Sequence, residues 1–364
     1  MKLNRGQDEA IKHGNGPCMV LAPPGSGKTL IVTERTRYLI EESGVRPDQI
    51  LVITFTRYAA REMKERFERL TAGKNYPVTF GTFHSIFYGI LKCAYGIGAN
   101  NLMSEKESSV LLQEVLDQTD IESTPEVEDE EELVRELLRE VGMVKNGLCH
   151  LKDFHSKYLT QDEFAEVFRS YEHQKKELKK FDFDDMLVYA YELFCARKDI
   201  LKSWQRMFKY ILVDEFQDIN SIQYKILCML AAPDNNLFVV GDDDQSVYSF
   251  RGASPDIMLG FPDDFKDSGI VRLSVNYRCS KCITEAAGRL IANNKNRYEK
   301  NIVSAYEGDG LKRIKIKTVK DVREQNDTII DDIRRLTQAG IPYGNMAALS
   351  STSLLRHAQR QPAT

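Results

Sequence analysis

The segment Ala22-Pro23-Pro24-Gly25-Ser26-Gly27-Lys28-Thr29 decides the fold of this 364-residue chain. A short apolar run at residues 18–22 precedes it and a segment with helical apolar spacing follows it, which is the strand, turn and helix setting of a phosphate-binding loop. Gly25 and Gly27 let backbone N–H groups converge on phosphate oxygens, and the positive end of the helix adds to the attraction. The first glycine of the usual pattern is Ala22 here. A chance glycine-rich turn is the alternative, but a Gly-Lys-Thr triplet directly after a strand argues against it.

Two side chains of this loop predict the ligand. Lys28 is expected to reach the β and γ phosphates of a nucleoside triphosphate, and Thr29 to bind the Mg²⁺ that accompanies them. A nucleoside triphosphate and Mg²⁺ are therefore the expected ligands, and since such loops serve kinases, switches, transporters and motors, other motifs must narrow the choice. The rest of the loop predicted to bind the nucleotide is Pro24, Gly25, Ser26 and Gly27.

A second apolar run is predicted to bring carboxylates to the same metal. Residues 211–213 read as a buried strand, and Asp214 and Glu215 follow at its carboxyl end, where α/β sheets bind ligands. Asp214 is predicted to hold Mg²⁺ through water, and Glu215 to orient and deprotonate the attacking water. Two adjacent acids at a strand end often only cap a helix, but a phosphate loop in the same chain favours the catalytic interpretation.

Composition bounds the class of protein. No apolar stretch is long enough to cross a bilayer and the first residues lack a signal peptide, so we expect a cytoplasmic protein without a membrane partner. The net charge of −4 does not indicate a nucleic-acid binder, but a narrow strand-binding groove requires only local positive charge and aromatic side chains.

The cysteines do not predict a disulfide framework, because their number is odd, seven, and most are isolated. Cys279 and Cys282 form one Cys-x-x-Cys pair. Zinc requires four ligands, and neither a second pair nor a histidine lies near. Ordinary thiols are therefore favoured over a metal or redox site.

Apolar patterning divides the chain into segments of different character. Strand-like runs at residues 50–55, 210–213, 237–240 and 270–275 alternate with helical spacing, which predicts a parallel sheet. Between about residues 99 and 180 the strands vanish and helical spacing dominates. An acidic run at residues 126–132 could be a partner site, but a solvated loop leading into a helix N-terminus is favoured. Residues 314–319 look strand-like and residues 328–336 helical, as at the start of a second α/β unit.

Several segments, in order along the chain, resemble the motifs of UvrD/Rep-type superfamily-1 helicases. They are Leu3-Asn4-Arg5-Gly6-Gln7 (Q motif), Thr54-Phe55-Thr56 with Ala59-Ala60-Arg61-Glu62-Met63 (Ia), Gly81-Thr82-Phe83-His84-Ser85 (Ib), Phe181-Asp182-Phe183-Asp184-Asp185-Met186-Leu187, Asp214-Glu215-Phe216-Gln217-Asp218 (II), residues 241–253 (III) and Asn276-Tyr277-Arg278-Cys279-Ser280 (IV).

The resemblance implies an α/β fold with a P-loop, RecA-like parallel sheet domain formed by residues 1–95 and 181–272. A helical subdomain at residues 96–180 would be inserted into it, and residues 273–364 would open a second RecA-like domain that is incomplete. Chemistry would then occur in the cleft between the two sheet domains.

For the nucleotide, the resemblance implies four further roles. Gln7 would read the adenine edge through its amide, and Tyr277 would stack on the base. Gln245 would contact the γ-phosphate. Arg278 would act as an arginine finger, so that hydrolysis requires the two sheet domains to close on ATP.

For nucleic acid, the resemblance implies contacts to a single strand of DNA from Phe55, Thr56, Thr82 and His84, whose hydroxyl and imidazole groups can bond phosphate without reading sequence. A structural histidine is the alternative for His84. In motif III the DNA-facing residues would be Tyr248, Phe250 and Arg251. Relatives usually carry Trp where Phe250 stands, so a weaker stacking contact is expected; core packing is the alternative for both aromatics.

The resemblance is close over about the first 305 residues and looser after them. No segments resembling motifs V and VI are found, so we expect a fragment that binds ATP and Mg²⁺ but hydrolyses slowly and does not unwind duplexes. The implied activity of the complete form is that of an ATP-dependent DNA helicase or translocase. Its substrate would be single-stranded DNA, or a duplex with a single-stranded tail, with repair or replication proteins as possible partners. The alternative is a truncated ATP-gated DNA- or protein-binding module, or a regulatory subunit, without efficient turnover. A helicase-nuclease subunit would require a nuclease domain further along.

Overall fold

The computed structural model describes residues 3–121, 129–247, 252–306 and 314–349. By its internal contacts the chain divides into two compact units, Met1–Asp309 and Gly310–Thr364. Among the described residues, no helix is long and apolar enough to span a membrane.

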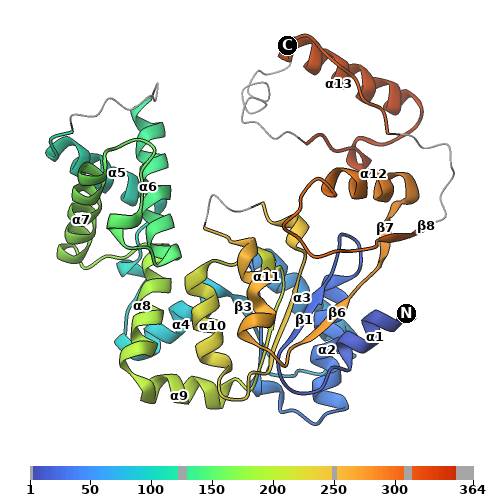
Figure 1. The fold of residues 1–364 in the computed structure, drawn as a ribbon, viewed down its shortest axis with the longest axis horizontal. Coiled ribbons are helices and arrows are strands. Elements are labelled where there is room, and N and C mark those ends of the chain that lie inside the picture. The colour runs from blue at the N-terminus through green and yellow to red at the C-terminus, as the bar shows by residue number, and fades with distance from the viewer. Residues whose placement is uncertain (1–2, 122–128, 248–251, 307–313, 350–364) are drawn as a thin grey trace. The chain divides into compact units, whose positions relative to one another are not determined.

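A six-stranded parallel sheet forms the centre of the first unit (Figure 1). Its strand order is β3-β2-β4-β5-β1-β6. The fold class is therefore α/β with a parallel sheet, as predicted. The strands are β1 (Cys18–Leu21), β2 (Ile50–Thr54), β3 (Thr79–Thr82), β4 (Tyr210–Val213), β5 (Leu237–Gly241) and β6 (Gly269–Arg272).

The central strands are apolar throughout because both faces of the sheet are covered. Alternate residues of β1 belong to two cores: Met19 and Leu21 pack on one face, and Cys18 and Val20 on the other. Helices that contribute to the second face are α1 (Arg5–Ile11), α2 (Lys28–Glu41) and α3 (Arg57–Leu70). Helices that contribute to the first face are α4 (Phe83–Tyr95), α8 (Phe183–Ala196), α9 (Lys198–Met207), α10 (Ser221–Ala231) and α11 (Pro255–Asp264).

Between α4 and α8 the chain forms a helical insertion with its own core, centred on Leu112, Leu137 and Phe164. Its helices are α5 (Glu105–Gln118), α6 (Glu130–Gly147) and α7 (Gln161–Glu177). The acids of the predicted helix start, Glu130, Glu131 and Glu132, form the first turn of α6, where they favour the helix dipole. The earlier part of that acidic run lies outside the described residues.

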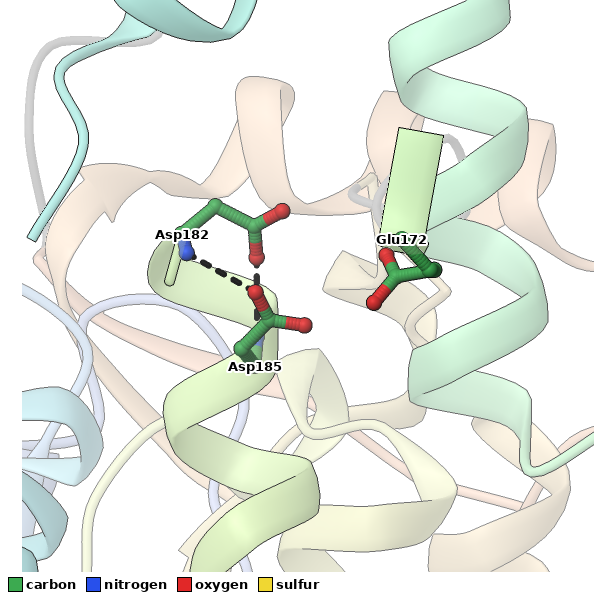
Figure 2. Close-up of side chains that lie close together, drawn as sticks. All are labelled: Glu172, Asp182 and Asp185. Carbon is green, nitrogen blue, oxygen red and sulfur yellow. Dashed lines mark hydrogen bonds between the residues drawn. The ribbon is translucent and has the colours of Figure 1, made fainter. Parts of the chain in front are cut away.

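Buried ion pairs join the insertion to α8, and we call this group the junction cluster: Lys145, Glu172, Lys175, Asp182 and Asp185. Figure 2 shows Asp182 and Asp185 together at the start of α8, with Glu172 of α7 facing them. Both lysine Nζ atoms lie 2.6–2.9 Å from oxygens of all three acids. These acids have the spacing of a metal site, but the ammonium groups supply the positive charge.

After β6 the chain leaves the large sheet. β7 (Val275–Ser280) pairs in parallel with β8 (Val303–Tyr306), and α12 (Lys281–Ile291) connects them. The single strand predicted at residues 270–275 is therefore wrong in extent. Its two halves bond different partners: the Leu273 N–H donates to Leu21, whereas Ser274 accepts a bond from Val303.

The described part of the second unit is residues 314–349, with one α-helix, α13 (Val322–Gln338). This helix contains the predicted helical segment 328–336. The predicted strand at residues 314–319 is wrong, because these residues form no ladder with any described strand, and Ile316 is 92% exposed.

Candidate functional site

The phosphate turn lies between β1 and α2 and depends on its glycines. Gly25 and Gly27 have φ values of +70° and +94°, in the left-handed region that other residues rarely adopt. Gly27 is also the N-cap of α2, so the free N–H groups of the first turn of this helix lie at the phosphate turn. The hydroxyl of Ser26 is buried and bonds to no described group. This local geometry is that of an anion cradle.

Lys28 is paired with the acid predicted to be the catalytic base. Its Nζ lies 3.0 Å from Oε2 of Glu215, which follows β4. Glu215 has φ +52°, an uncommon conformation for a residue with a side chain, and it aims the carboxylate at the phosphate turn. The structure therefore brings Lys28 and Glu215 together, as the sequence predicts.

Asp214 is the most strongly perturbed acid of the site. Burial, and then the charge of Glu215, raise the pKa of Asp214 to about 7, which Lys28 only partly offsets. Its Oδ1 is buried without a hydrogen-bond partner among the described groups. The pKa of Asp218 is raised to about 6, again by burial first and Glu215 second.

These buried oxygens fit a hard divalent cation. Carboxylate, hydroxyl and water oxygens are the ligands that Mg²⁺ prefers. Asp214 offers an unpartnered oxygen, and Thr29 lies in the first turn of α2, directly after the phosphate turn. The role of the Thr29 hydroxyl as a metal ligand stays a prediction.

Gln7, predicted to read adenine, is 2% exposed and supports the turn. Its Nε2 donates to the carbonyl of Ser26 at 3.0 Å, and its Oε1 accepts from the N–H of Asn4 in a capping box at the start of α1. A Cβ on Gly27 would lie 3.2 Å from Gln7 Nε2. In this structure Gln7 therefore packs against the phosphate turn.

Gln217 of η4 (Phe216–Asp218) links the acids of motif II to motif III. Its Nε2 donates to Glu215 Oε2 at 2.9 Å, and its Oε1 accepts from the N–H of Asp242 at 3.0 Å. Gln245, at the end of η5 (Asp243–Gln245), donates from Nε2 to Asp242 Oδ2 at 2.7 Å. Glu215 and Gln245 are thus two ends of one hydrogen-bonded chain. Gln217 was not among the predicted site residues.

The motif IV strand, β7, lies directly against the phosphate turn. Tyr277 donates its N–H to Gly25, and its hydroxyl accepts from Asn4 Nδ2 at 2.9 Å. A Cβ on Gly25 would lie 2.7 Å from the Cβ of Arg278. The Asn276 carboxamide accepts from the N–H groups of Arg278 and Cys279, both at 2.8 Å, which fixes the bend that carries Arg278. Both predicted motif IV residues therefore lie beside the turn.

A cavity of about 530 Å³ lies where α3, β3, α4 and α8 meet. Arg57, Arg61 and Lys64 of α3 give it positive charge. Its aromatic lining includes His84 and Phe183, whose rings meet edge to face with centroids 5.7 Å apart. Positive charge beside aromatic faces suits single-stranded nucleic acid.

The predicted DNA-contacting residues are distributed unevenly around this cavity. Thr82 and His84 line it. Thr56 and Thr82 are the N-caps of α3 and α4, so their hydroxyls accept helix N–H groups. Phe55 lies between β2 and Thr56 and is half-buried. The other predicted contacts, Tyr248, Phe250 and Arg251, lie outside the described residues.

The sequence analysis did not identify the basic residues of α3 that line the cavity, or Phe183, as site residues. The signal for the first was present, since residues 57, 61 and 64 are spaced to share one face of a helix. Phe183 follows Asp182, the N-cap of α8, and only the packing of α8 against α4 shows that it faces His84.

Comparison with known proteins places these features in a family. The family described as "UvrD/REP helicase N-terminal domain" matches residues 3–266, and that described as "UvrD-like helicase C-terminal domain" matches residues 271–358. The second match does not support the expectation that the chain is a fragment without motifs V and VI.

Several bacterial proteins are similar over nearly the whole chain. The "Putative ATP-dependent DNA helicase YjcD" of Bacillus subtilis is 37% identical over 357 residues, which is 96% of this chain and 46% of that protein. The "ATP-dependent DNA helicase PcrA" of Staphylococcus aureus is 33% identical over 356 residues, 96% of this chain and 48% of that protein. The chain thus spans about half the length of these relatives. With its phosphate turn, paired acids and matched residues 3–266, the chain belongs to the UvrD/REP helicase family.

Proposed function

We propose that this chain is the ATP-binding part of an ATP-dependent DNA helicase that moves on single-stranded DNA. The observation that carries the proposal is the convergence of Lys28, Glu215 and the unpartnered Asp214 carboxylate beside a glycine turn. The relatives named as ATP-dependent DNA helicases support it.

In this proposal the chain's own residues position the nucleotide and the water. The N–H groups of the turn and Lys28 bind phosphate oxygens, and Lys28 exchanges its contact with Glu215 for the phosphates. Glu215, released from Lys28, takes the proton of the attacking water. Bound Mg²⁺, held by Asp214 and Thr29, would neutralise charge on the phosphates.

Completion of the site requires groups from motifs III and IV. Gln245 is linked to Glu215 by hydrogen bonds through intervening residues, and its side chain would contact the γ-phosphate. Arg278, on the strand against Gly25, would offer its planar guanidinium to charge that develops during hydrolysis. Tyr277 would stack on the base from the same strand.

For DNA, we propose that the cavity lined by Arg57, Arg61, Thr82, His84 and Phe183 belongs to the path of the single strand. Its arginines would meet phosphates and its aromatic rings would meet bases. Phe55, Thr56, Tyr248, Phe250 and Arg251 remain proposed contacts on sequence grounds. A single strand, or a duplex with a single-stranded tail, is the proposed substrate, and repair or replication proteins are the proposed partners. The three-part division, residues 1–95 with 181–272, 96–180 and 273–364, also remains a proposal.

ATPase assays with and without single-stranded DNA test the proposal. We expect turnover that DNA stimulates, and a loss of about 100-fold or more in Lys28→Ala, since that change removes the charge that meets the phosphates. Lys106→Ala, at an exposed position of α5, is the matched control and should retain full activity.

The outcomes separate the two readings of the chain. ATP binding without turnover would favour an ATP-gated binding module. A chain that neither binds nor hydrolyses ATP would contradict both readings. A strand-separation assay on the same chain tests the expectation of weak unwinding, which rapid separation of a tailed duplex would refute.

A further inference from the structure

Three consecutive aspartates follow β5, and one lysine from a distant segment contacts them all. Nζ of Lys300 lies 2.5 Å from Asp242 Oδ1, 2.6 Å from Asp243 Oδ1 and 2.8 Å from Asp244 Oδ2. Arg297 adds a two-pronged contact to Asp244, at 2.7 and 2.6 Å. We call these five residues the motif III cluster.

The inner side chains of the motif III cluster are almost inaccessible to solvent. The side chain of Lys300 is 2% exposed, and those of Asp242 and Asp243 are each 1% exposed. Buried carboxylates are unfavourable unless a positive charge or hydrogen-bond donors compensate them. Because solvent has little access to these carboxylates, the Lys300 ammonium group restricts the orientations that the aspartates can adopt.

Asp242 passes this constraint on to the proposed catalytic groups. One carboxylate oxygen meets Lys300, and the other accepts the Nε2 donor of Gln245 at 2.7 Å. Its N–H donates to Gln217, whose Nε2 bonds Glu215. If Asp242 turned, Gln245 would lose its acceptor.

The chain around Lys300 is also tied to the strand that carries Arg278. Three residues beyond Lys300, Val303 opens β8, which pairs with β7. The Ser304 hydroxyl donates to the carbonyl of Cys279 at 2.6 Å. One short segment thus bonds motif III at one end and the motif IV strand at the other.

We propose that Lys300 is a positioning residue for ATP hydrolysis, which holds Gln245 in place through Asp242 and links its orientation to the motif IV strand. The inference rests on the proposed ATPase function and deepens it. Arg297 has a supporting role, because it fixes Asp244, the neighbour of Gln245.

Kinetics on the full chain test this role. In Lys300→Met, which removes the charge and keeps the stem, kcat for DNA-stimulated hydrolysis should fall about tenfold or more, while the Kd for a fluorescent ATP analogue changes less than about threefold. Lys300→Arg should recover most of the loss. Lys295→Met, at an exposed position of the same segment, should match the unmodified chain. Retention of kcat within about twofold in Lys300→Met would overturn the inference.

A double variant separates positioning from general stability. If Lys300 acts through Gln245, adding Lys300→Met to Gln245→Ala should cause little further loss of kcat. Additive losses, or a parallel loss of ATP affinity and melting temperature, would assign Lys300 a purely structural role. If Lys300→Met does not fold, Arg297→Met decides: a lower kcat with unchanged Kd supports the inference, and an unchanged kcat refutes it.

Hydrogen exchange tests the geometry even if the unmodified chain shows no turnover, in which case only the proposed function fails. Lys300→Met should speed exchange at residues 242–245, where Gln245 N–H bonds the Asp242 carbonyl, and leave α2 unchanged. Equal exchange at residues 242–245 in both proteins would overturn the inference.

Discussion

The junction cluster and the nucleotide site both bury acidic side chains, but they balance the charge differently. In the junction cluster three acids share two lysines at 2.6–2.9 Å. Burial alone would raise the pKa of Asp182, yet Lys145 and Lys175 hold it below its usual value, whereas burial keeps the pKa of the neighbouring Asp185 above its usual value despite the same lysines. In the nucleotide site Lys28 only partly offsets the effects of burial and of the Glu215 charge, and the pKa values of Asp214 and Asp218 rise to about 7 and about 6.

This contrast separates a structural use of buried charge from a functional one. Acids that two lysines contact directly hold two parts of the chain together, and most of their charge is compensated without a ligand. Buried acids without full compensation destabilise the empty site. A cation that binds them removes this unfavourable contribution, which favours cation binding. Three predictions test the contrast.

The largest effect is expected in the junction cluster. Lys175→Met would leave three buried acids with one lysine, and we expect a loss of about 3–5 kcal/mol in the free energy of unfolding. Denaturant titration measures it. Lys176→Met, the exposed neighbour on α7, is the control and should change little. A loss under about 1 kcal/mol would mean that the acids of the junction cluster are neutral in the folded chain.

Substitution of Asp214 is expected to change the free energy of unfolding in the opposite direction, toward greater stability. An unfolded aspartate releases its proton near its ordinary pKa of 3.8, whereas folded Asp214 keeps it to about 7. Between these values the folded state binds more protons, so this group makes stability fall as pH rises from 4 to 7, after which it stays constant. Asp214→Asn should therefore stabilise the chain at pH 8 by roughly 1–3 kcal/mol, and the gain should vanish toward pH 4.

Thermal unfolding across this pH range checks the Asp214 prediction. Asp267→Asn, at an exposed position, is the control and should show no such pH dependence. Destabilisation by Asp214→Asn at pH 8 would indicate that the carboxylate is compensated after all, and the contrast with the junction cluster would not hold.

The smallest effect concerns the ligand. At tenfold excess over its Kd, Mg²⁺ with ADP should stabilise the unmodified chain by about 1.4 kcal/mol. Chelation with EDTA should remove most of this gain, and Asp214→Asn should weaken it, because the metal loses a ligand. Lys176→Met should retain it in full. An equal gain in Asp214→Asn would remove Asp214 from the metal site.

Local patterns predicted much of this molecule. The buried strands at residues 18–22, 50–55, 210–213 and 237–240 were found close to their predicted limits, since a strand covered on both faces is apolar throughout. The glycine turn and the acids after β4 were placed together because carboxyl ends of parallel strands meet at one edge of a sheet.

What the sequence did not show depends on contacts between distant residues. Lys145 and Lys175 look like ordinary helix-surface lysines, and only the packing of α6 and α7 against α8 brings them onto Asp185. Lys300 lies 58 residues from Asp242 in the chain. The strand predicted at residues 314–319 was wrong for the converse reason: its apolar pattern was present, but these residues form no ladder with a described strand.

The order of the strands in the large sheet has a consequence for how the chain is made. β1, which leads into the phosphate turn, pairs with β5 and β6 and not with β2. Gly241 lies 220 residues beyond Leu21, its partner in β1. At ribosomal rates of roughly 5–20 residues per second, β1 waits on the order of 10–40 s for its first neighbour. During that time β1 lacks both of its sheet partners, so its apolar side chains are a segment to which a chaperone can bind.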